Sequence, residues 1–187
     1  ITVWYIDGSG RVFSMDGRYD PVSGTVTFST THFRTFAVVY DPIARLAGTD
    51  RVETALRIAR AAYRDKVSHV VLATAENYPD ALAGSVLAYR LGAPILLVGS
   101  AEADQKKVID YLKANLAPEG TVYILGGTTV VSSGMENKIQ NSGFKHITRI
   151  AGETRYDTAV KIAEQLNVKT GTQVVLVSGE NYPDALA

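Results

Sequence analysis

The sequence predicts an α/β protein in which a doubly wound parallel sheet follows a small β segment. Residues 1–42 contain only short strand patterns separated by turns. From residue 43 onward, short buried strands alternate with helical patterns, and a 39-residue stretch recurs 104 residues later. Strands that are apolar on both faces and alternate with helices of about 10–15 residues are typical of a parallel sheet covered by helices on both sides.

Residues 1–42 read as β structure because alternating β-forming residues are separated by Asp7–Gly10 and Asp20–Gly24, which have turn composition. Four short strands bury little apolar surface, so we expect this segment to be the C-terminal part of a larger β-rich domain. The expected strands are Thr2–Ile6, Arg11–Met15, Thr25–Ser29 and Thr35–Tyr40.

This segment is also rich in aromatic residues. An exposed aromatic row would stack on sugars, whereas the alternative is that these rings form the core of a small sheet. The residues concerned are Trp4, Tyr5, Phe13, Tyr19, Phe28, Phe33, Phe36 and Tyr40.

The α/β part begins after Asp41-Pro42, because proline fixes its own backbone and restricts the residue before it. Asp50, followed three residues later by Glu53, resembles a helix-capping pair. The expected helices cover 51–63, 78–91, 101–116 and 129–141, and the expected strands are Ala44–Ala47, His69–Thr74, Ala93–Val98, Thr121–Leu125 and His146–Ala151.

An internal repeat is the strongest signal in the sequence. Arg45–Ala83 and Arg149–Ala187 align without a gap, and 19 of 39 positions are identical. The motif Glu-Asn-Tyr-Pro-Asp-Ala-Leu-Ala recurs unchanged at 76–83 and 180–187. A period near 100 residues indicates tandem domains rather than a solenoid of short repeats.

The second copy stops inside its second expected helix, and the chain begins with Ile1 rather than Met. We therefore expect a piece of a longer protein. The predicted domains are a β part at 1–42, a first module at 43–146 and the start of a second module at 147–187. Residues 147–151 should complete the sheet of the first module. The expected helix at 155–166 and strand at 173–178 must then pack on a neighbour, on another copy of the chain or on residues outside this sequence. A homo-oligomer is one of these expectations.

The repeated motifs, together with Ala-Pro-Ile-Leu-Leu at 93–97 and Val-Tyr-Ile-Leu-Gly-Gly at 122–127, resemble the bacterial cell-wall-binding repeat type 2 family over residues 43–187. The resemblance implies a Rossmann-like fold in tandem modules, usually three around a pseudo-threefold axis. It also implies non-covalent anchoring of secreted, S-layer-associated surface proteins to an anionic polysaccharide or teichoic-acid-like polymer of a Gram-positive cell wall. Neighbouring modules of the same protein are further expected partners. In the family, the residues at Pro94, Ile95, Leu96 and Leu97 are implicated in polymer attachment, although here they also read as a buried strand.

The carboxyl ends of the expected strands form the predicted polymer-binding edge, since ligands of open α/β sheets favour the crevice beyond those ends. Each segment there opens a helix, whose unpaired N–H groups suit anions, and an arginine would add a bidentate contact. Besides the four residues of 94–97, the candidates are Arg51, Asn77, Asp80, Gly126, Gly127, Thr128, Arg155, Asn181 and Asp184.

Each candidate also has a purely structural interpretation. Asn77 reads as a helix N-cap paired with Asp80, and Gly126-Gly127 as a tight turn. Arg51 reads equally well as a clamp to Glu53, Glu76 or Asp80, and Pro79 fits the first turn of a helix.

Composition excludes several functions. The formal net charge is zero, which argues against nucleic-acid binding, and the chain has no cysteine for disulfides, thiolate metal sites or nucleophiles. We expect no membrane insertion, because the most apolar stretch, 81–101, is interrupted by Arg90 and by Gly92-Ala93-Pro94. Phosphate-binding glycine motifs and the Gly-x-Ser-x-Gly motif are absent. We expect no catalytic residue, metal or cofactor; the alternative is a Rossmann-like enzyme domain acting on a nucleotide or sugar phosphate, with Glu76 and Asp80 as an acid/base pair.

Overall fold

The computed structural model describes residues 2–15, 17–31, 35–39 and 45–186. The chain divides into two compact units, Ile1–Arg45 and Leu46–Ala187, and each is described by itself.

The first unit consists of antiparallel strands. β1 (Thr2–Ile6) pairs with both β2 (Val12–Met15) and β5 (Thr35–Val39), while β3 (Gly17–Asp20) and β4 (Thr25–Phe28) form a separate hairpin. The sequence predicted four of these strands and missed β3, whose composition resembles a turn.

Aspartates fix the two hairpin turns of this unit. The Asp7 carboxylate accepts hydrogen bonds from the backbone N–H groups of Ser9 and Arg11, at 2.8 and 2.9 Å. Asp20 accepts hydrogen bonds from the Ser23 hydroxyl at 2.7 Å and from the N–H of Val22 at 2.9 Å, and these two bonds, in that order, hold the Asp20 pKa below its usual value. Turn formation therefore rests on local side-chain bonds.

The aromatic residues of the first unit mostly contact one another. Tyr5 stacks on Phe13 with ring centroids 5.7 Å apart, and Phe28 meets Phe36 at 4.9 Å. Phe13 nevertheless remains 47% exposed. Packing explains this cluster without a sugar; Phe33 and Tyr40 lie outside the described residues.

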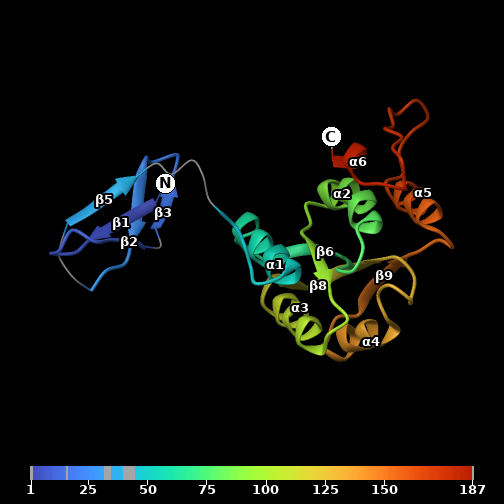
Figure 1. The fold of residues 1–187 in the computed structure, drawn as a ribbon, viewed down its shortest axis with the longest axis horizontal. Helices are drawn as coiled ribbons and strands as arrows, with labels where there is room; N and C mark the ends of the chain where they lie inside the picture. Colours follow the sequence, from blue (N-terminus) through green and yellow to red (C-terminus); the bar gives the residue numbers. More distant parts are fainter. Residues whose placement is uncertain (1, 16, 32–34, 40–44, 187) are drawn as a thin grey trace. The chain divides into compact units, whose positions relative to one another are not determined.

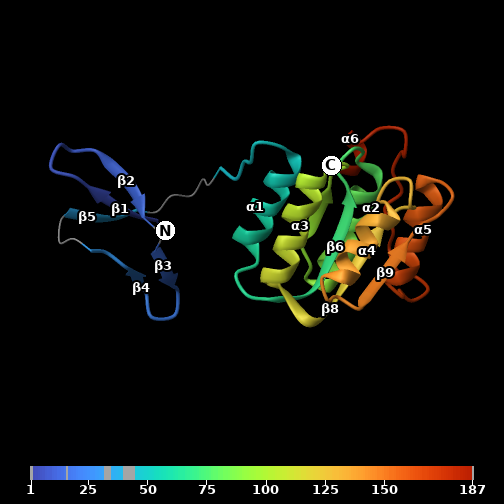
Figure 2. The ribbon, with the colours of Figure 1, turned by 90° about the horizontal axis from the view of Figure 1, so that it is seen from below.

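The second unit is a four-stranded, all-parallel sheet in the order β7-β6-β8-β9, with helices on both faces (Figures 1 and 2). Its elements run α1 (Arg51–Ala62), β6 (Val67–Thr74), α2 (Pro79–Leu91), β7 (Ile95–Val98), α3 (Glu102–Asn115), β8 (Leu116–Leu125), α4 (Ser133–Asn141), β9 (His146–Ile150), α5 (Arg155–Gln165) and α6 (Pro183–Leu186).

The central strand β6 shows why the helices must cover both faces. Val70 and Leu72 point into one apolar cluster with α1, α3 and α4, whereas Val71 points into a second cluster with α2 and α5. All three side chains are fully buried. Burying a large apolar side chain contributes about 1.5–3 kcal/mol, so a strand that is apolar on both faces needs a helix layer on each side.

The helix ends follow local sequence signals. Asp50 caps α1 by accepting the Glu53 N–H at 2.7 Å, and Thr154 and Asp157 form a capping box at the start of α5. Pro79 occupies the first turn of α2, and Gly92 ends α2 in the left-handed conformation (φ +59°), which glycine adopts without strain.

Strand β9 ends in the first residues of the second sequence copy, Arg149 and Ile150, and pairs parallel with β8. Helix α5 follows it and packs against α2, with Ile162 in the same apolar cluster as Leu87. β9 is therefore the edge strand of the four-stranded sheet, and α5 lies in the same helix layer as α2.

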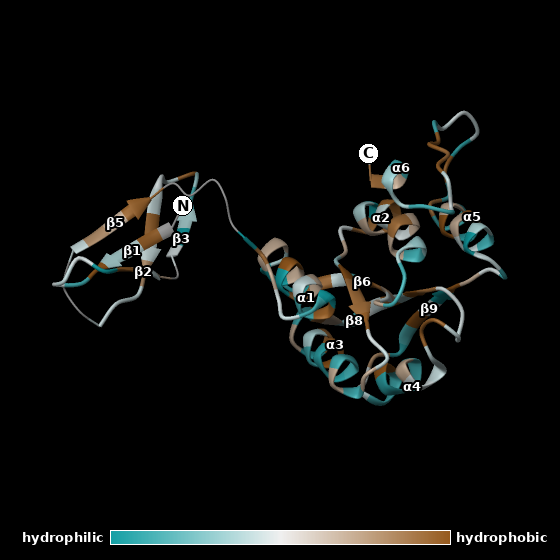
Figure 3. Cartoon of the chain, viewed as in Figure 1, coloured by the Kyte–Doolittle hydropathy of each residue, from teal (hydrophilic) through white to brown (hydrophobic). Residues whose placement is uncertain are grey.

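Two predicted strands are wrong. Arg45–Ala47 is in no strand, while Ala44 lies outside the described residues. Residues 173–178 are also irregular, and Val174, Val175 and Leu176 are 82–97% exposed, forming the hydrophobic stretch between α5 and α6 in Figure 3. A strand needs a hydrogen-bonding neighbour: the matching strand β6 lies between β7 and β8, whereas residues 173–178 pair with none of the described strands.

Candidate functional site

A cavity of about 440 Å³ opens at the carboxyl edge of the sheet, where the sequence placed the binding edge. It lies where β6 ends at Thr74 and β7 ends at Val98, and the loop between β8 and α4 closes one side. Its volume is in the range of small-ligand sites. The lining residues are Thr74, Glu76, Asn77, Val98, Gly99, Ser100, Gln105, Thr129, Val130, Val131 and Ser132.

Hydroxyl and amide groups dominate the polar lining of this cavity, and among its described lining residues Glu76 alone is charged. The nearby lysines are paired with carboxylates: Lys107 bonds Asp104 at 2.9 Å and Asp50 at 3.2 Å. Those bonds raise the pKa of Lys107. Lys138 likewise bonds Glu102 at 2.8 Å, which lowers the Glu102 pKa. The cavity is therefore suited to hydroxyl-bearing groups more than to isolated anions.

The two candidate arginines make the same contact in both copies. Arg51 donates from Nη1 to the carbonyl oxygen of Ala75 at 2.5 Å, and Arg155 donates from Nη1 to that of Gly179 at 2.7 Å. The sequence suggested that Arg51 bridges to Glu53, Glu76 or Asp80. Arg51 does bridge two elements, but its partner is a backbone carbonyl. Both arginines are exposed at their helix starts.

The N-cap interpretation of Asn77 is wrong. Helix α2 begins at Pro79 with Tyr78 as its N-cap residue, and the Asn77 side chain accepts a hydrogen bond from the Tyr78 N–H at 2.9 Å. Asn181 makes the same bond to Tyr182 at 2.9 Å. Asn77 lines the cavity, so its amide group is available at that edge.

Asp80 occupies a different place from Asn77. It is half-buried under the turn at Gly126, and burial raises the pKa of its carboxyl, while the positive charge of Arg155 opposes part of that rise. Asp80 is not among the residues lining the cavity. Its equivalent Asp184 is exposed at the start of α6.

Gly126, Gly127 and Thr128 form the turn after β8. Gly126 has φ +88° and donates its N–H to the Ile150 carbonyl at 2.8 Å, and a Cβ here would clash with Asp80 and Val130. The Gly127 carbonyl accepts the N–H of Val130 at 3.1 Å, while Thr128 is exposed. The turn interpretation explains both glycines, and their neighbours Thr129 and Val130 line the cavity.

Pro94, Ile95, Leu96 and Leu97 lie at the start and along the length of β7, an edge strand of the sheet. The Pro94 carbonyl accepts the N–H of Val71 at 3.0 Å, and Leu96 is fully buried in the core. Packing therefore accounts for this segment, and the cavity lining begins only after it, with Val98, Gly99 and Ser100.

Sequence reasoning missed Thr74, Gln105 and Ser132 as lining residues. Thr74 is the last residue of β6, and its hydroxyl accepts the Glu76 N–H at 3.2 Å. Gln105 is the fourth residue of α3, and Ser132 is the N-cap of α4. The sequence predicted a strand that ends at Thr74, but it did not predict that the first residues of α3 and α4 lie beside the cavity.

The Asn-Tyr-Pro-Asp motifs of the two copies lie against each other. The rings of Tyr78 and Tyr182 meet edge to face, and the Tyr78 hydroxyl donates to the Glu180 carbonyl at 3.2 Å. Glu180 also accepts a hydrogen bond from the hydroxyl of Tyr156, which raises the Tyr156 pKa. Residues 180–182, which include Asn181, and Arg155, whose charge acts on Asp80, are therefore brought to the start of α2.

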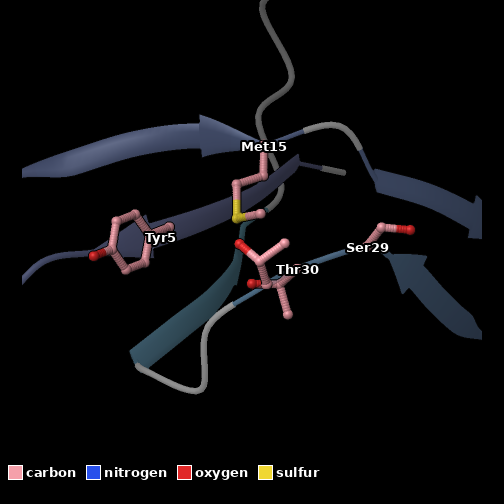
Figure 4. Close-up of a pocket in the computed structure, with 5 residues that line it drawn as sticks. Tyr5, Met15, Ser29 and Thr30 are labelled. Atoms are coloured by element: carbon pink, nitrogen blue, oxygen red, sulfur yellow. The ribbon is translucent and has the colours of Figure 1, made fainter.

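A second hollow, of about 310 Å³, lies within the first unit and is lined by Tyr5, Met15, Ser29, Thr30 and Thr31 (Figure 4). Its lining includes none of the sequence-predicted polymer-binding residues. Within the described ranges, we find neither a cluster of His, Asp or Glu suited to a metal ion nor a helix long and apolar enough to span a bilayer.

Comparison with known proteins identifies the fold. The chain is similar to Cwp6 from Clostridium difficile (28% identity, TM-score 0.55, covering 65% of this chain and 19% of that one) and to Cwp8 from the same organism (30%, TM-score 0.53, covering 64% and 19%). The four-stranded parallel sheet with its helices is therefore a fold shared with these proteins.

A curated relative is the N-acetylmuramoyl-L-alanine amidase LytC of Bacillus subtilis (strain 168), which is 42% identical over 66 residues. The match covers 35% of this chain and 13% of LytC, so the chain spans a small part of each of these relatives. The model of the family described as cell wall binding domain 2 (CWB2) matches residues 45–136 and 149–187, which is more than half of the chain. The chain therefore belongs to the cell wall binding domain 2 family.

Proposed function

We propose that this chain is a non-catalytic binding module that holds a secreted surface protein at a Gram-positive cell wall. The observation that carries this proposal is the family match across two consecutive copies of the same domain. Its ligand is an anionic secondary cell-wall polymer of the polysaccharide or teichoic-acid type, bound without a covalent link.

The proposed organisation follows the repeat. Residues 1–42 are the end of a β-rich domain, 43–146 form a first Rossmann-like, doubly wound module, and 147–187 begin a second module. The pairing of β9 with β8 supports a shared boundary, in which 147–151 serve the first module's sheet.

The carboxyl edge of the sheet is the proposed contact surface for the polymer. The cavity there has hydroxyl and amide groups that suit sugar hydroxyls. A guanidinium group has five N–H donors, and the Arg51 bond to Ala75 is made by Nη1. The remaining donors of Arg51, and likewise of Arg155, bind the acidic groups of the polymer, outside the cavity itself.

Co-sedimentation of the chain with purified wall sacculi tests this function. We expect pelleting with sacculi that carry the secondary polymer and none with sacculi stripped of it; equal pelleting with both would overturn the proposal. Arg51→Ala should reduce pelleting, while Arg57→Ala is the matched control, since Arg57 is exposed on the same helix and pairs with Glu53. Equal losses in both variants would remove the role given to Arg51.

No specific observation favours the alternative of a nucleotide or sugar-phosphate enzyme. The raised pKa of Asp80 follows from its burial, and Asp80 lies outside the cavity that Glu76 lines. The two carboxylates therefore do not share one site in which to act as acid and base.

A further inference from the structure

Glu76 and Glu180 are the same residue of the repeated motif, but their carboxylates differ in their partners. The Glu180 carboxylate accepts a hydrogen bond from the Tyr156 hydroxyl. In the first copy the position of Tyr156 is taken by Val52, which is buried and carries no polar group. Within the described ranges, the Glu76 carboxylate has no hydrogen-bonding or ion-pair partner, and Glu76 lines the cavity.

The cationic side chains around the cavity are engaged elsewhere. Arg51 donates from Nη1 to the carbonyl oxygen of Ala75, the residue before Glu76, and forms no ion pair with the Glu76 carboxylate. Lys107 and Lys138 bond carboxylates that are not among the lining residues. The cavity therefore has one negative charge with which no described cation pairs.

Backbone N–H groups that would attract an anion at this edge are already bonded to side-chain oxygens. Helix α2 has no N–H at its first position, because that residue is Pro79. At the starts of α2 and α4, an incoming phosphate would thus meet the Glu76 charge with few free N–H donors to offset it. The side chains that accept these N–H groups, at 2.9–3.2 Å, are Thr74, Asn77 and Ser132, and the donors are the N–H groups of Glu76, Tyr78 and Met135.

The same bonds leave hydrogens in the cavity that can be donated to a ligand. A hydroxyl whose oxygen accepts a hydrogen bond keeps its own hydrogen to donate, and a side-chain amide keeps its NH2 group. This applies to the hydroxyls of Thr74 and Ser132 and to the amide of Asn77. A matching ligand therefore has hydroxyl oxygens beside a positive charge, and the volume of about 440 Å³ suits a small group of that kind.

We propose that the cavity binds the ammonium group of a hydroxylated, amine-bearing unit of the cell-wall polymer, with Glu76 as its counter-ion. This binding mode rests on the proposed function, since it names the part of the polymer that enters the cavity. The acidic groups of the polymer stay with Arg51 and Arg155, so the preferred polymer carries both charges. An amino sugar without its N-acetyl group and an aminoacyl ester both supply such an amine.

Titration of the 187-residue chain with glucosamine and with N-acetylglucosamine, followed by amide NMR, tests the charge directly. We expect shifts at 74–77 and 129–132 with glucosamine, and binding weaker by about fivefold or more for the acetylated sugar, which has no charge to pair with Glu76. Glu76→Gln keeps the side-chain shape and should abolish this preference. Equal binding of the two sugars, binding of neither, or a preference that survives Glu76→Gln would overturn the proposal.

The matched control for Glu76→Gln is Glu119→Gln. The Glu119 side chain is 89% exposed and pairs with His146 at the opposite edge of the sheet. This variant should keep the full preference for glucosamine. Loss of the preference in both variants would mean that the overall charge of the chain, and not Glu76, selects the amine.

Chemically treated sacculi distinguish the two sources of the amine. Acetic anhydride blocks both kinds of amine, whereas mild alkali removes aminoacyl esters only. We expect pelleting to fall by about fivefold or more after acetylation, although the sacculi become more negative, a change that would not weaken recognition of acidic groups alone. Pelleting that is also lost after mild alkali assigns the amine to an ester, and pelleting that survives alkali assigns it to an amino sugar.

The same assay separates this binding mode from the proposed function. Pelleting that requires the secondary polymer but is unchanged by acetylation would overturn the ammonium site and leave wall anchoring intact. Equal pelleting with polymer-bearing and stripped sacculi would overturn the anchoring function itself.

Discussion

The rings of Tyr78 and Tyr182 meet edge to face with their centroids 5.4 Å apart, although 104 residues separate them. They are the same residue of the same repeated motif, so the two copies contact each other through identical sequence. The hydrogen bond from the Tyr78 hydroxyl to the Glu180 carbonyl, at 3.2 Å, lies beside this pair. This contact, the bond from Arg155 to the Gly179 carbonyl and the bond from Tyr156 to Glu180 hold the segment after α5, in which Val174–Leu176 are exposed.

Tyr182→Ala should therefore loosen the segment around α6. An edge-to-face aromatic pair contributes about 0.5–1.5 kcal/mol beyond area burial, so the loss is local rather than global. We expect faster amide hydrogen exchange across 179–186 and no change in β6 or β8. Tyr89→Ala, at an 89% exposed position on α2, is the control. Unchanged exchange at 179–186 would contradict a role for the ring pair.

Ile58 of α1 and Ile162 of α5 are equivalent in the 104-residue repeat and predict very unequal effects of one substitution on this chain. Ile162→Ala should lower the free energy of unfolding by about 2–5 kcal/mol, because it leaves a cavity between α5 and α2. Ile58→Ala should change the free energy of unfolding by no more than about 0.5 kcal/mol, since the side chain is half exposed. Chemical denaturation of both variants measures the difference. Similar losses would mean that α5 does not rely on α2.

Asp80 predicts a specific dependence of stability on pH. Its pKa is raised in the folded protein, so the folded state binds this proton more tightly than the unfolded state. The contribution of Asp80 to stability is therefore full below about pH 3.9, the unfolded value, and is lost as the pH rises through the folded pKa. Asp80→Asn should raise the melting temperature at pH 7 and have little effect at pH 3.

The matched control for Asp80 is Asp184→Asn, because Asp184 is the repeat equivalent and is exposed. It should leave the melting temperature unchanged at both pH values. A lower melting temperature for Asp80→Asn at pH 7 would show that attraction to Arg155 outweighs the cost of burial.

Substitutions of Arg51 and Arg155 can distinguish a role in stability from a role in polymer binding. Arg51→Ala and Arg155→Ala each remove a hydrogen bond to a backbone carbonyl, so both should lower the melting temperature by a few degrees. If they also contact the polymer, binding per folded molecule falls as well, and Arg→Lys does not restore it, since lysine lacks the planar fork of arginine. If stability falls while binding per folded molecule is unchanged, the two arginines only bond the backbone carbonyls and do not contact the polymer.

Sequence patterns predicted the order of elements along the α/β unit well. Helix α2 ends at Gly92 as expected, and the expected strand at His146–Ala151 is β9, which pairs with β8. Helix boundaries differ from the predicted ones where capping residues and turns determine them. Helix α4 begins at Ser133 rather than 129, because the turn at Gly126–Val131 precedes its Ser132 cap.

Of the candidate polymer-binding residues, Asn77 alone lines the cavity at the carboxyl edge of the sheet. That edge is the one that the sequence predicted. Asp80 instead lies under the Gly126 turn, and Leu96 is in the core. Gln105 and Ser132 line the cavity because α3 and α4 begin close to it in the folded chain. Sequence spacing alone does not predict how close these helices lie.

The sequence alone determined the class of fold, the repeat and the family, because hydrophobic period and motif identity are properties of local residue order. Tertiary structure alone decided which identical residues are buried. The Val-Val-Leu of 70–72 forms a central strand, while the same residues at 174–176 are exposed, and Ile162 is covered where Ile58 is not. The physical reason is that burial and strand pairing require a partner surface: β6 lies between β7 and β8, and α5 packs on α2, whereas the second copy's apolar segment has no neighbouring strand within the described residues.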